Sequence, residues 1–561
     1  MNQAVHNKLI SFIWSIADDH LRDVYVRGKY RDVILPMVVL RRLDSLLEPT
    51  KEAVLEEVAL QNKEGFAEED SDALKHVSGY VFYNTSKWTL KSLKETASNN
   101  QHILLANLEE YLQGYSDNVK EIINCFNLVA QLRHMASKNV LLEVLADFVS
   151  PYLNLSPNDH IDPDGYKMPG LTNLGMGYVF EELIRKFNEE NNEEAGEHFT
   201  PREVIELMTH LVFDPCKDML PNSITVYDPA CGSGGMLTES QNFILDKYPS
   251  KGFTRSIYLY GKEINDETYA ICKSDMMIKG NNPENIKVGS TLSTNTFVDT
   301  KFDFMLSNPP YGKSWSSEKK NIMDGKEVID TRFVVDLANY WGELSIENAT
   351  PRSSDGQLLF LMEMIDKMKS TDNGSQGSRI ASVHNGSSLF TGDAGSGESN
   401  IRRYVIENDY LEAIIQMPNN LFYNTGITTY IWLLSNNKTA QRQGKVQLID
   451  ASQMYRKLKK NLGDKNCEFS PSDIETITKA YLDMAIIERS PTDFNEKGDP
   501  VGIASQVFDN HDFGYHKVTI ERPDRRHAQM RNELIAELRY DNQLSDAMRQ
   551  LYELHGDKLY D

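Results

Sequence analysis

The sequence predicts an α/β protein: a doubly wound, Rossmann-like sheet flanked by an N-terminal helical domain and a C-terminal helical tail. Two observations support this prediction. Apolar residues in the first 165 positions recur at intervals of three and four, which is the period of an amphipathic helix. From about residue 170 to 450, short β-branched or aromatic runs alternate with helical stretches, as they do in doubly wound sheets. We therefore predict a helical domain 1–165, an α/β domain 166–460 and a helical region 461–561.

The N-terminal domain is predicted from three periodic stretches. Residues 9–17 are as apolar as part of a signal peptide, but they lack a strongly basic lead. Their isoleucines recur at helical spacing, so we interpret the stretch as a packed amphipathic helix. Residues 32–43 and 119–132 show the same spacing. A segment rich in Asn, Asp, Pro and Gly, residues 156–169, indicates the boundary with the next domain.

The α/β domain contains six runs that we expect to be strands. Sheets of this class bind their ligands at the carboxyl ends of the strands, so the residues that follow each run are the candidates for a site. The runs are residues 224–227, 256–260, 302–306, 379–383, 411–415 and 430–434.

Composition excludes several classes of protein. A membrane-spanning helix needs about 20 consecutive apolar residues, and the sequence has only short apolar runs. The five cysteines are scattered and form no CxxC pair, which argues against a disulfide framework or a zinc site and favours a reducing cytoplasm. The formal net charge of −23 is unfavourable for contact with nucleic acid. A protein of this charge that binds DNA needs either a local basic patch or a partner subunit that provides most of the contacts with the phosphates.

A glycine-rich loop follows the first strand of the α/β domain. Residues 228–237 read DPACGSGGML, and the glycines let the backbone turn tightly and approach a ligand closely. The next strand ends at Glu263, whose carboxylate can accept hydrogen bonds from both ribose hydroxyls of a nucleoside. The sequence therefore predicts a nucleoside site, and a glycine-rich turn without a ligand is the alternative.

Two other nucleotide motifs fail in detail. The dinucleotide-binding motif requires a third glycine at position 237, which is Leu. Residues 312–314 imitate the end of a phosphate-binding loop, but its first glycine would be at position 307, which is Ser. An adenosine ligand without a phosphate chain fits the residues better.

The strand at 302–306 is followed by Asn308, Pro309, Pro310 and Tyr311. The lone pair of an aromatic exocyclic amine is delocalised into the ring, which makes the amine a poor nucleophile. The side-chain oxygen of Asn308 and the carbonyl of Pro309 can each accept one amine hydrogen and stabilise the positive charge that develops on nitrogen. The Tyr311 ring offers a face for a base that has been flipped out of the duplex. A rigid Pro-Pro turn is the alternative interpretation.

On these residues the chain resembles the modification subunits of type I restriction-modification systems, within the adenine-N6 DNA methyltransferases. The order of residues 196–202 (GEHFTPR), the glycine loop and the tetrapeptide is that of the γ group. The resemblance implies a Rossmann-like methyltransferase sheet, S-adenosylmethionine as cofactor and Asn308, Pro309, Pro310 and Tyr311 as catalytic residues. It implies that the cofactor is bound by Glu197, His198, Phe199, Thr200, Pro201, Arg202, Asp228, Gly232, Ser233, Gly234, Gly235 and Glu263.

Two further segments, residues 421–427 and 513–523, also resemble this family. Ser290 is a departure, because relatives often have Asp there to contact the cofactor's adenine; a serine can still hydrogen-bond that ring. No second His or Cys lies at ligand spacing from His198, so we expect packing or cofactor contact there and no metal site.

The resemblance implies methyl transfer to N6 of an adenine flipped out of double-stranded DNA. It implies a specificity subunit joined by two modification subunits, a restriction (motor and nuclease) subunit, a cytoplasmic location and no membrane contact. A protein glutamine methyltransferase is the alternative enzyme, and a non-catalytic S-adenosylmethionine-binding assembly subunit is the alternative from another class.

The C-terminal segment, residues 525–561, has leucines and arginines at helical intervals. The resemblance favours a helix contact with the specificity subunit, while packing on the chain's own domain is the alternative. The apolar positions are Leu534, Leu538, Leu544, Met548 and Leu551.

Overall fold

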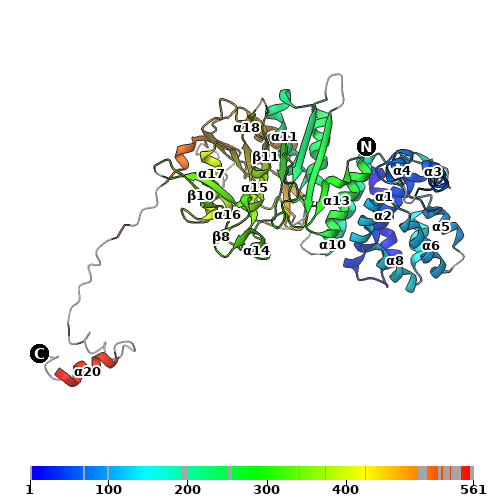
Figure 1. The fold of residues 1–561 in the computed structure, drawn as a ribbon, viewed down its shortest axis with the longest axis horizontal. Helices are drawn as coiled ribbons and strands as arrows, with labels where there is room; N and C mark the ends of the chain where they lie inside the picture. The colour runs from blue at the N-terminus through cyan, green and yellow to red at the C-terminus, as the bar shows by residue number, and fades with distance from the viewer. Residues whose placement is uncertain are drawn as a thin grey trace. The chain divides into compact units, whose positions relative to one another are not determined.

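The structure, a computed structural model, forms two compact units, Met1–Phe513 and Gly514–Asp561 (Figure 1). In the second unit the described helix is α20 (Ser545–His555), where Glu553 and Leu554 are exposed. The described residues are 3–66, 70–97, 100–191, 200–249, 255–339, 341–372, 375–423, 425–489, 502–515, 520–521, 531, 533 and 545–555.

The first unit begins with a helical region, as predicted. The expected helix at 9–17 is confirmed as part of α1, and that at 32–43 as part of α2. The periodic stretch 119–132 is two helices, α7 and α8, because Asn127 adopts a left-handed conformation with φ 52°. The helices are α1 (Gln3–Ile16), α2 (Arg31–Leu47), α3 (Lys51–Glu64), α4 (Ser71–Ser78), α5 (Leu90–Thr96), α6 (Gln101–Gln113), α7 (Asp117–Cys125), α8 (Leu128–Ser137) and α9 (Leu141–Phe148).

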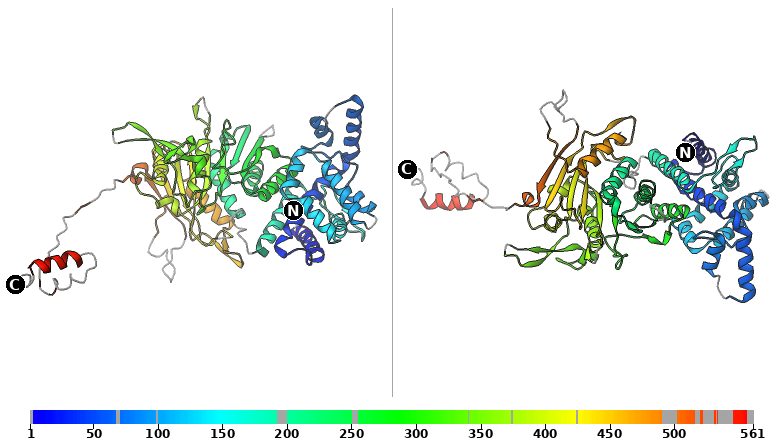
Figure 2. Two further views of the ribbon diagram at one scale, coloured as in Figure 1. Left: turned by 60° about the horizontal axis from the view of Figure 1, so that its bottom comes forward. Right: turned by 90° about the horizontal axis from the view of Figure 1, so that it is seen from above.

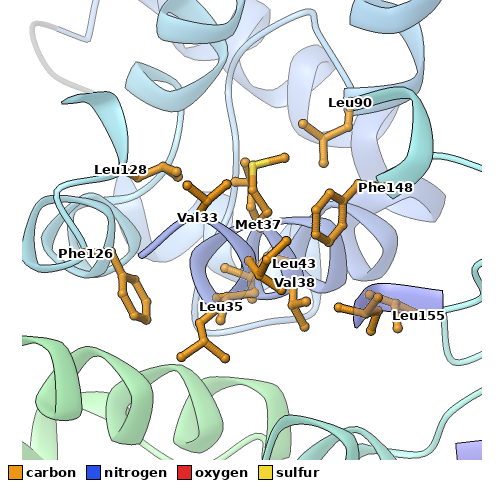
Figure 3. Close-up of a cluster of buried hydrophobic side chains, with 14 of the residues drawn as sticks. Val33, Leu35, Met37, Val38, Leu43, Leu90, Phe126, Leu128, Phe148 and Leu155 are labelled. Atoms are coloured by element: carbon orange, nitrogen blue, oxygen red, sulfur yellow. The ribbon is translucent and has the colours of Figure 1, made fainter. Parts of the chain in front are cut away.

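Helix α2 is the centre of this region. It is buried on every side from Val33 to Leu47 with the exception of Arg41, which is the pattern of a helix surrounded by others. Figure 3 shows its side chains meeting those of the surrounding helices and loops. The residues labelled there are Val33, Leu35, Met37, Val38 and Leu43 of α2, with Leu90, Phe126, Leu128, Phe148 and Leu155 around them.

The α/β region is built on a nine-stranded sheet in the order β17-β14-β12-β13-β11-β6-β3-β4-β5. Strands β13 and β17 run antiparallel to their neighbours, and the other strands of this sheet run in one direction. The strands are β3 (Ser223–Asp228), β4 (Ser256–Glu263), β5 (Ile286–Val288), β6 (Phe304–Ser307), β11 (Arg379–Asn385), β12 (Leu411–Gln416), β13 (Thr429–Ser435), β14 (Lys445–Asp450) and β17 (Ala504–Asp509).

All six predicted strands are present in this sheet, so the doubly wound α/β class is confirmed. Strands β5, β14 and β17 were not predicted. The chain after residue 460 is not uniformly helical, contrary to our expectation, because β17 pairs with β14 at the edge of the sheet. The hairpin formed by β15 (Arg456–Leu462) and β16 (Lys465–Glu468) also lies in this part of the chain.

Helices and short hairpins surround the sheet. The hairpins are β1 (His160–Ile161) with β2 (Lys167–Met168), β7 (Met323–Asp324) with β8 (Glu327–Val328), and β9 (Val334–Ala338) with β10 (Leu344–Asn348). The helices are α10 (Asn173–Asn191), α11 (Arg202–Phe213), α12 (Gly235–Lys247), α13 (Asp266–Lys279), α14 (Lys319–Ile322), α15 (Gln357–Asp366), α16 (Ser387–Phe390), α17 (Gly397–Glu407) and α18 (Pro471–Leu482).

Helices α10 and α13 join the N-terminal helices to the sheet. Figures 1 and 2 show the blue-to-cyan N-terminal helices gathered beside them, and α13 packs against α7, α10 and α2. Apolar residues of both helices belong to the same hydrophobic cluster as the N-terminal core. They are Met176, Val179, Phe180, Leu183, Ala270, Ile271, Met277 and Ile278, among others.

Two expectations from composition concern the whole chain. Among the described residues, no helix combines the length and the apolar character needed to cross a membrane. All five cysteines are free thiols, and burial raises the pKa of Cys216 to about 11.

Candidate active site

A cavity of about 310 Å³ lies where β3, β4 and β6 end at the carboxyl edge of the sheet. Its volume is at the lower end of the roughly 300–1,000 Å³ that ligand pockets occupy. The cavity is lined by residues that the sequence singled out from five separate segments. They are Thr200, Arg202, Asp228, Gly232, Ser233, Gly235, Glu263, Ser290, Asn308 and Pro310.

The glycine loop and Glu263 are joined by a hydrogen bond. The backbone N–H of Gly232 donates to Oε2 of Glu263 at 3.0 Å, and Oε1 accepts from the N–H of Asn265 at 2.9 Å. The Glu263 side chain is 6% exposed, so both bonds are protected from water. They fix the carboxylate at the cavity wall, and each oxygen keeps a lone pair for a ligand hydroxyl.

Gly234 shows why the loop needs glycine. Its φ of 88° is disfavoured for other residues, and a Cβ there would lie 2.8 Å from Sγ of Cys272. Gly234 is not among the residues that line the cavity; its role is to bring the start of α12 close to α13. Gly232 and Gly235, by contrast, do line the cavity.

Asp228 connects the glycine loop to the loop that carries Asn308. Its Oδ1 accepts from the hydroxyl of Ser307 at 2.6 Å and from the N–H of Ala230 at 3.0 Å. Burial raises the pKa of Asp228 to about 7, although these two hydrogen bonds favour the charged form. The carboxyl group therefore changes its charge near neutral pH.

Asn308 lies in the cavity wall with one polar atom paired and one unpaired. Its Nδ2 donates to Oγ1 of Thr200 at 3.1 Å. Its Oδ1 is buried and has no hydrogen-bond partner. A buried acceptor without a partner costs about 1–3 kcal/mol, so the site holds an acceptor that a ligand N–H can satisfy. Thr200, more than a hundred residues away in the sequence, sets the direction of that acceptor.

The remaining residues of the tetrapeptide are placed differently. Pro310 lines the cavity, whereas Pro309 is buried and does not. Tyr311 is also absent from the lining: its ring is partly buried against the hydrophobic core of the sheet, and burial raises the pKa of its hydroxyl. The predicted use of the Tyr311 ring as a stacking face stays a prediction.

The segment 196–202 is described in part. Glu197, His198 and Phe199 lie outside the described residues. Pro201 begins α11, and its carbonyl accepts from the N–H of Val204 at 3.0 Å. The Arg202 guanidinium lies over the ring of Tyr178 from α10, 4.3 Å from the ring centroid. This cation–π contact connects the start of α11 to α10 at the cavity wall.

The sequence did not predict the part of the cavity wall that α10 and α13 form. Gly177 of α10 and the ion pair between Lys279 and Asp275 of α13 line the cavity there, with 2.6 Å between Nζ and Oδ2. Trp315 and Phe360 supply apolar surface. Asp275 and Lys279 are spaced four residues apart, but an i,i+4 ion pair is common on any helix and did not signal a site.

Ser290 belongs to a loop whose shape depends on a buried arginine. Arg332 donates from Nη1 to the carbonyl of Thr291 at 2.8 Å and from Nη2 to that of Leu292 at 3.0 Å. Asp330 and Glu363 pair with the same guanidinium at 2.6 and 2.8 Å and raise its pKa against the effect of burial. Thr291 and Leu292 line the cavity, so Arg332 holds one of its walls.

The sheet order, the cavity at the carboxyl edge and the convergence of the glycine loop, Glu263 and Asn308 define a methyltransferase-type α/β protein. The N-6 DNA Methylase family matches residues 173–502, and the HsdM N-terminal domain family matches residues 9–148. The chain belongs to the N-6 DNA Methylase family.

Curated relatives are 24–28% identical to this chain over the matched regions. The type I restriction enzyme MpnII methylase subunit of Mycoplasma pneumoniae is 27% identical over 337 residues, which is 58% of this chain and 54% of that protein. The type I restriction enzyme MjaIX methylase subunit of Methanocaldococcus jannaschii is 24% identical over 459 residues, 80% of this chain and 72% of that protein. The first of these matches spans about half the length of the relative.

A solved structure has a similar fold. The type I restriction-modification system methyltransferase subunit of Streptococcus thermophilus aligns with a TM-score of 0.59 and 22% identity, over 90% of this chain and 96% of that one. The aligned portion therefore includes parts of both the helical region and the α/β region.

Proposed function

We propose that this chain is the modification subunit of a type I restriction-modification complex. It transfers a methyl group from S-adenosylmethionine to N6 of an adenine flipped out of double-stranded DNA. The observation that carries the proposal is the buried, unpartnered Oδ1 of Asn308 at the wall of a nucleoside-sized cavity.

The residues of the cavity fit S-adenosylmethionine. The carboxylate of Glu263 would accept the ribose hydroxyls, because its two oxygens are already fixed by backbone N–H groups on one side. Gly232 would let the backbone pass close to the ligand. Ser290 and Leu292 would border the adenine ring, and Asp228 would face the positively charged part of the cofactor. S-adenosylmethionine, when bound, supplies a methyl group made electrophilic by a positive sulfur.

Asn308 accounts for activation of the amine. Its Oδ1 accepts a hydrogen bond from N6 and stabilises the positive charge that develops as the nitrogen lone pair attacks the methyl carbon. S-adenosylmethionine would supply the methyl group at this step, the electron pair of its C–S bond would remain on its sulfur, and the released N6 proton would pass to solvent. The bond from Nδ2 to Thr200 keeps the amide from rotating, so the acceptor costs no reorganisation during the reaction. In this proposal the Pro309 carbonyl accepts the second amine hydrogen, and Tyr311 turns out of its packed position to stack on the base.

The proposed partners are DNA, a specificity subunit bound by two modification subunits, and a restriction (motor and nuclease) subunit. The proposed location is the cytoplasm. Segment 525–561 is proposed to contact the specificity subunit, but all of its predicted apolar positions except Met548 and Leu551 lie outside the described residues. The predicted domain limits are 1–165, 166–460 and 461–561. We keep the first limit as a proposal and move the second to residue 513, because β17 belongs to the sheet.

Two alternatives are disfavoured by specific observations. The family match to N-6 DNA methylases, together with a match of the N-terminal helices to the HsdM N-terminal domain, disfavours a protein glutamine methyltransferase. A non-catalytic S-adenosylmethionine-binding subunit has no need for an aligned acceptor such as Asn308 Oδ1, which costs stability when it is unpaired.

Methyl transfer to DNA tests the proposal directly. Labelled S-adenosylmethionine is supplied with duplex DNA and the specificity subunit, with DNA alone, or with a glutamine-containing protein. We expect label in N6-methyladenine only in the first reaction. Asn308→Ala should lower turnover about 10²–10³-fold and leave cofactor affinity unchanged. Label in the protein acceptor, or in no acceptor, would overturn the proposal.

A further inference from the structure

The charge of the chain is locally reversed in one hairpin. The whole chain carries a formal charge of −23, yet β15 contains Arg456, Lys457, Lys459 and Lys460 within five residues. We call β15 and β16, with the turn between them, the basic hairpin. All four of these cationic side chains are exposed.

Two acidic groups in and beside the basic hairpin are paired with its cations. Glu468 pairs with Arg456 across the hairpin at 2.8 Å, and Glu203 of α11 pairs with Lys465. Within the described part of the chain, no carboxylate forms an ion pair with Lys457, Lys459 or Lys460. The hairpin therefore presents three unpaired lysines to solvent on an acidic protein. Among the described residues of the hairpin, Asp464, exposed in its turn, is the one carboxylate without an ion pair.

The basic hairpin lies at the same edge of the sheet as the cavity. It follows the carboxyl end of β14, which runs parallel to β12 and, through the sheet, to the strands that end at the cavity. Its turn is held against the loop after β12: the N–H of Asp464 donates to the carbonyl of Tyr423 at 2.9 Å, and that of Asn466 to the carbonyl of Asn420 at 3.0 Å.

A buried lysine connects the hairpin to the start of α11, close to the residue that contacts Asn308. Lys465, 2% exposed, donates to the carbonyls of Leu421 and Cys467 at 2.9 and 2.8 Å and pairs with Glu203. Glu203 lies in the first turn of α11, directly after Arg202 of the cavity wall and three residues after Thr200, the partner of Asn308. The position of the basic hairpin is therefore fixed relative to Asn308.

We infer that the basic hairpin binds the phosphate backbone of the DNA duplex whose adenine enters the cavity, through Lys457, Lys459 and Lys460. This inference rests on the proposed function. A strand rises about 3.3 Å per residue, so the three ammonium groups extend over a stretch on which a duplex presents several phosphates. Lysine contacts phosphates as a point charge and does not read sequence, which suits a subunit whose partner selects the site.

The acidity of the rest of the chain strengthens this role. Phosphates are repelled by the acidic surface and attracted at the basic hairpin, so the field favours a duplex placed with its target base towards the cavity. The hairpin thus supplies the local basic patch that the net charge of the chain required.

The test removes the three charges in the assembled complex. Lys457, Lys459 and Lys460 are all replaced by Gln, and the complex with the specificity subunit is purified. The matched control replaces Lys217, Lys247 and Lys445 by Gln; these are exposed lysines near the amino ends of β3, β4 and β14, on the opposite edge of the sheet. Both variants lose the same total charge. Methylation rates and DNA affinity are measured from about 50 to about 200 mM salt, a range over which the loss of phosphate contacts clearly changes DNA affinity.

We expect the hairpin variant to have a KM for DNA at least tenfold higher than that of the control. The plot of log affinity against log salt should become less steep by up to about 3, because each phosphate contact contributes about 0.9 to the steepness. S-adenosylmethionine affinity and thermal stability should match those of the control. An equal KM and salt slope in the two variants would overturn the inference. Failure of the hairpin variant to co-purify with the specificity subunit would also overturn it, because the hairpin would then be a protein contact. A wild-type complex that methylates no DNA would instead refute the proposed function.

Discussion

The hydrogen bond between Thr200 and Asn308 makes a specific prediction about catalysis. Thr200→Val removes the hydroxyl that accepts from Nδ2 of Asn308 at 3.1 Å and replaces it with a methyl group of similar size. The Asn308 amide then has no fixed orientation, and its Oδ1, which is unpartnered in the cavity wall, is aimed at N6 for only part of the time. Thr200→Ser keeps the hydroxyl and serves as the matched control.

The size of the effect follows from the kind of bond that is lost. A neutral hydrogen bond contributes about 0.5–1.5 kcal/mol net, so turnover should fall roughly 2- to 13-fold in Thr200→Val. Asn308→Ala removes the acceptor itself and should cost about 10²–10³-fold. Thr200 is a positioning residue in this scheme. Its removal should therefore have no further effect in a chain that already lacks Asn308.

Single-turnover methylation of duplex DNA by the complex measures these rates free of product release. The five chains needed are wild type, Thr200→Val, the control Thr200→Ser, Asn308→Ala and the double variant, with cofactor affinity measured by calorimetry for each. Equal rates for wild type and Thr200→Val would refute the reasoning. So would a further loss in the double variant relative to Asn308→Ala, because Thr200 would then act by another route.

Three more predictions concern the cofactor, all measured by calorimetry. Gly232→Asp should abolish S-adenosylmethionine binding, and Glu263→Ala should weaken it about 10- to 100-fold, as the loss of a hydrogen bond to a charged group predicts; unchanged affinity in both would reject the assignment. Arg332→Met and Arg379→Met each break a buried ion pair and should both lower stability by about 3–5 kcal/mol, but only Arg332→Met should weaken cofactor binding. Because its pKa is raised to about 7, the Asp228 carboxyl group is neutral below pH 7 and anionic above it. The affinity for the cationic cofactor should therefore rise several-fold from about pH 6 to about pH 8, and the affinity of Asp228→Asn should not change over this range.

The sequence predicted those strands and helices whose own apolar pattern indicates the element that forms. The six predicted strands are central strands with continuous apolar runs, such as β11, in which six of seven residues are buried. Strand β5 has only three residues, and β17 alternates without an apolar run, so neither gave a periodic signal. The split between α7 and α8 depends on one residue, Asn127, in a conformation that sequence periodicity does not report.

The sequence predicted those residues of the candidate site that belong to short motifs of functional residues. Asp228, Glu263 and Asn308 were found because each follows a strand within a recognisable motif, and all line one cavity. Arg332 and Lys465 were not found. Each acts through carbonyl groups of loops distant in sequence, and a single basic residue carries no sign of such a contact. The arrangement exists only after the chain has folded.

The division of the chain at residue 165 separates elements that the packing joins. Apolar residues of α10 and α13, such as Phe180 and Ile271, lie in the same hydrophobic cluster as the N-terminal helices, and both residues also line the cavity. The glycine loop lines the same cavity, so residues carried by the sheet and residues of the helical core both form its wall. A displacement of the N-terminal helices would therefore move α10 and α13 relative to Asn308 and change the shape of the cavity. The helical region is part of the active-site architecture as much as the sheet is.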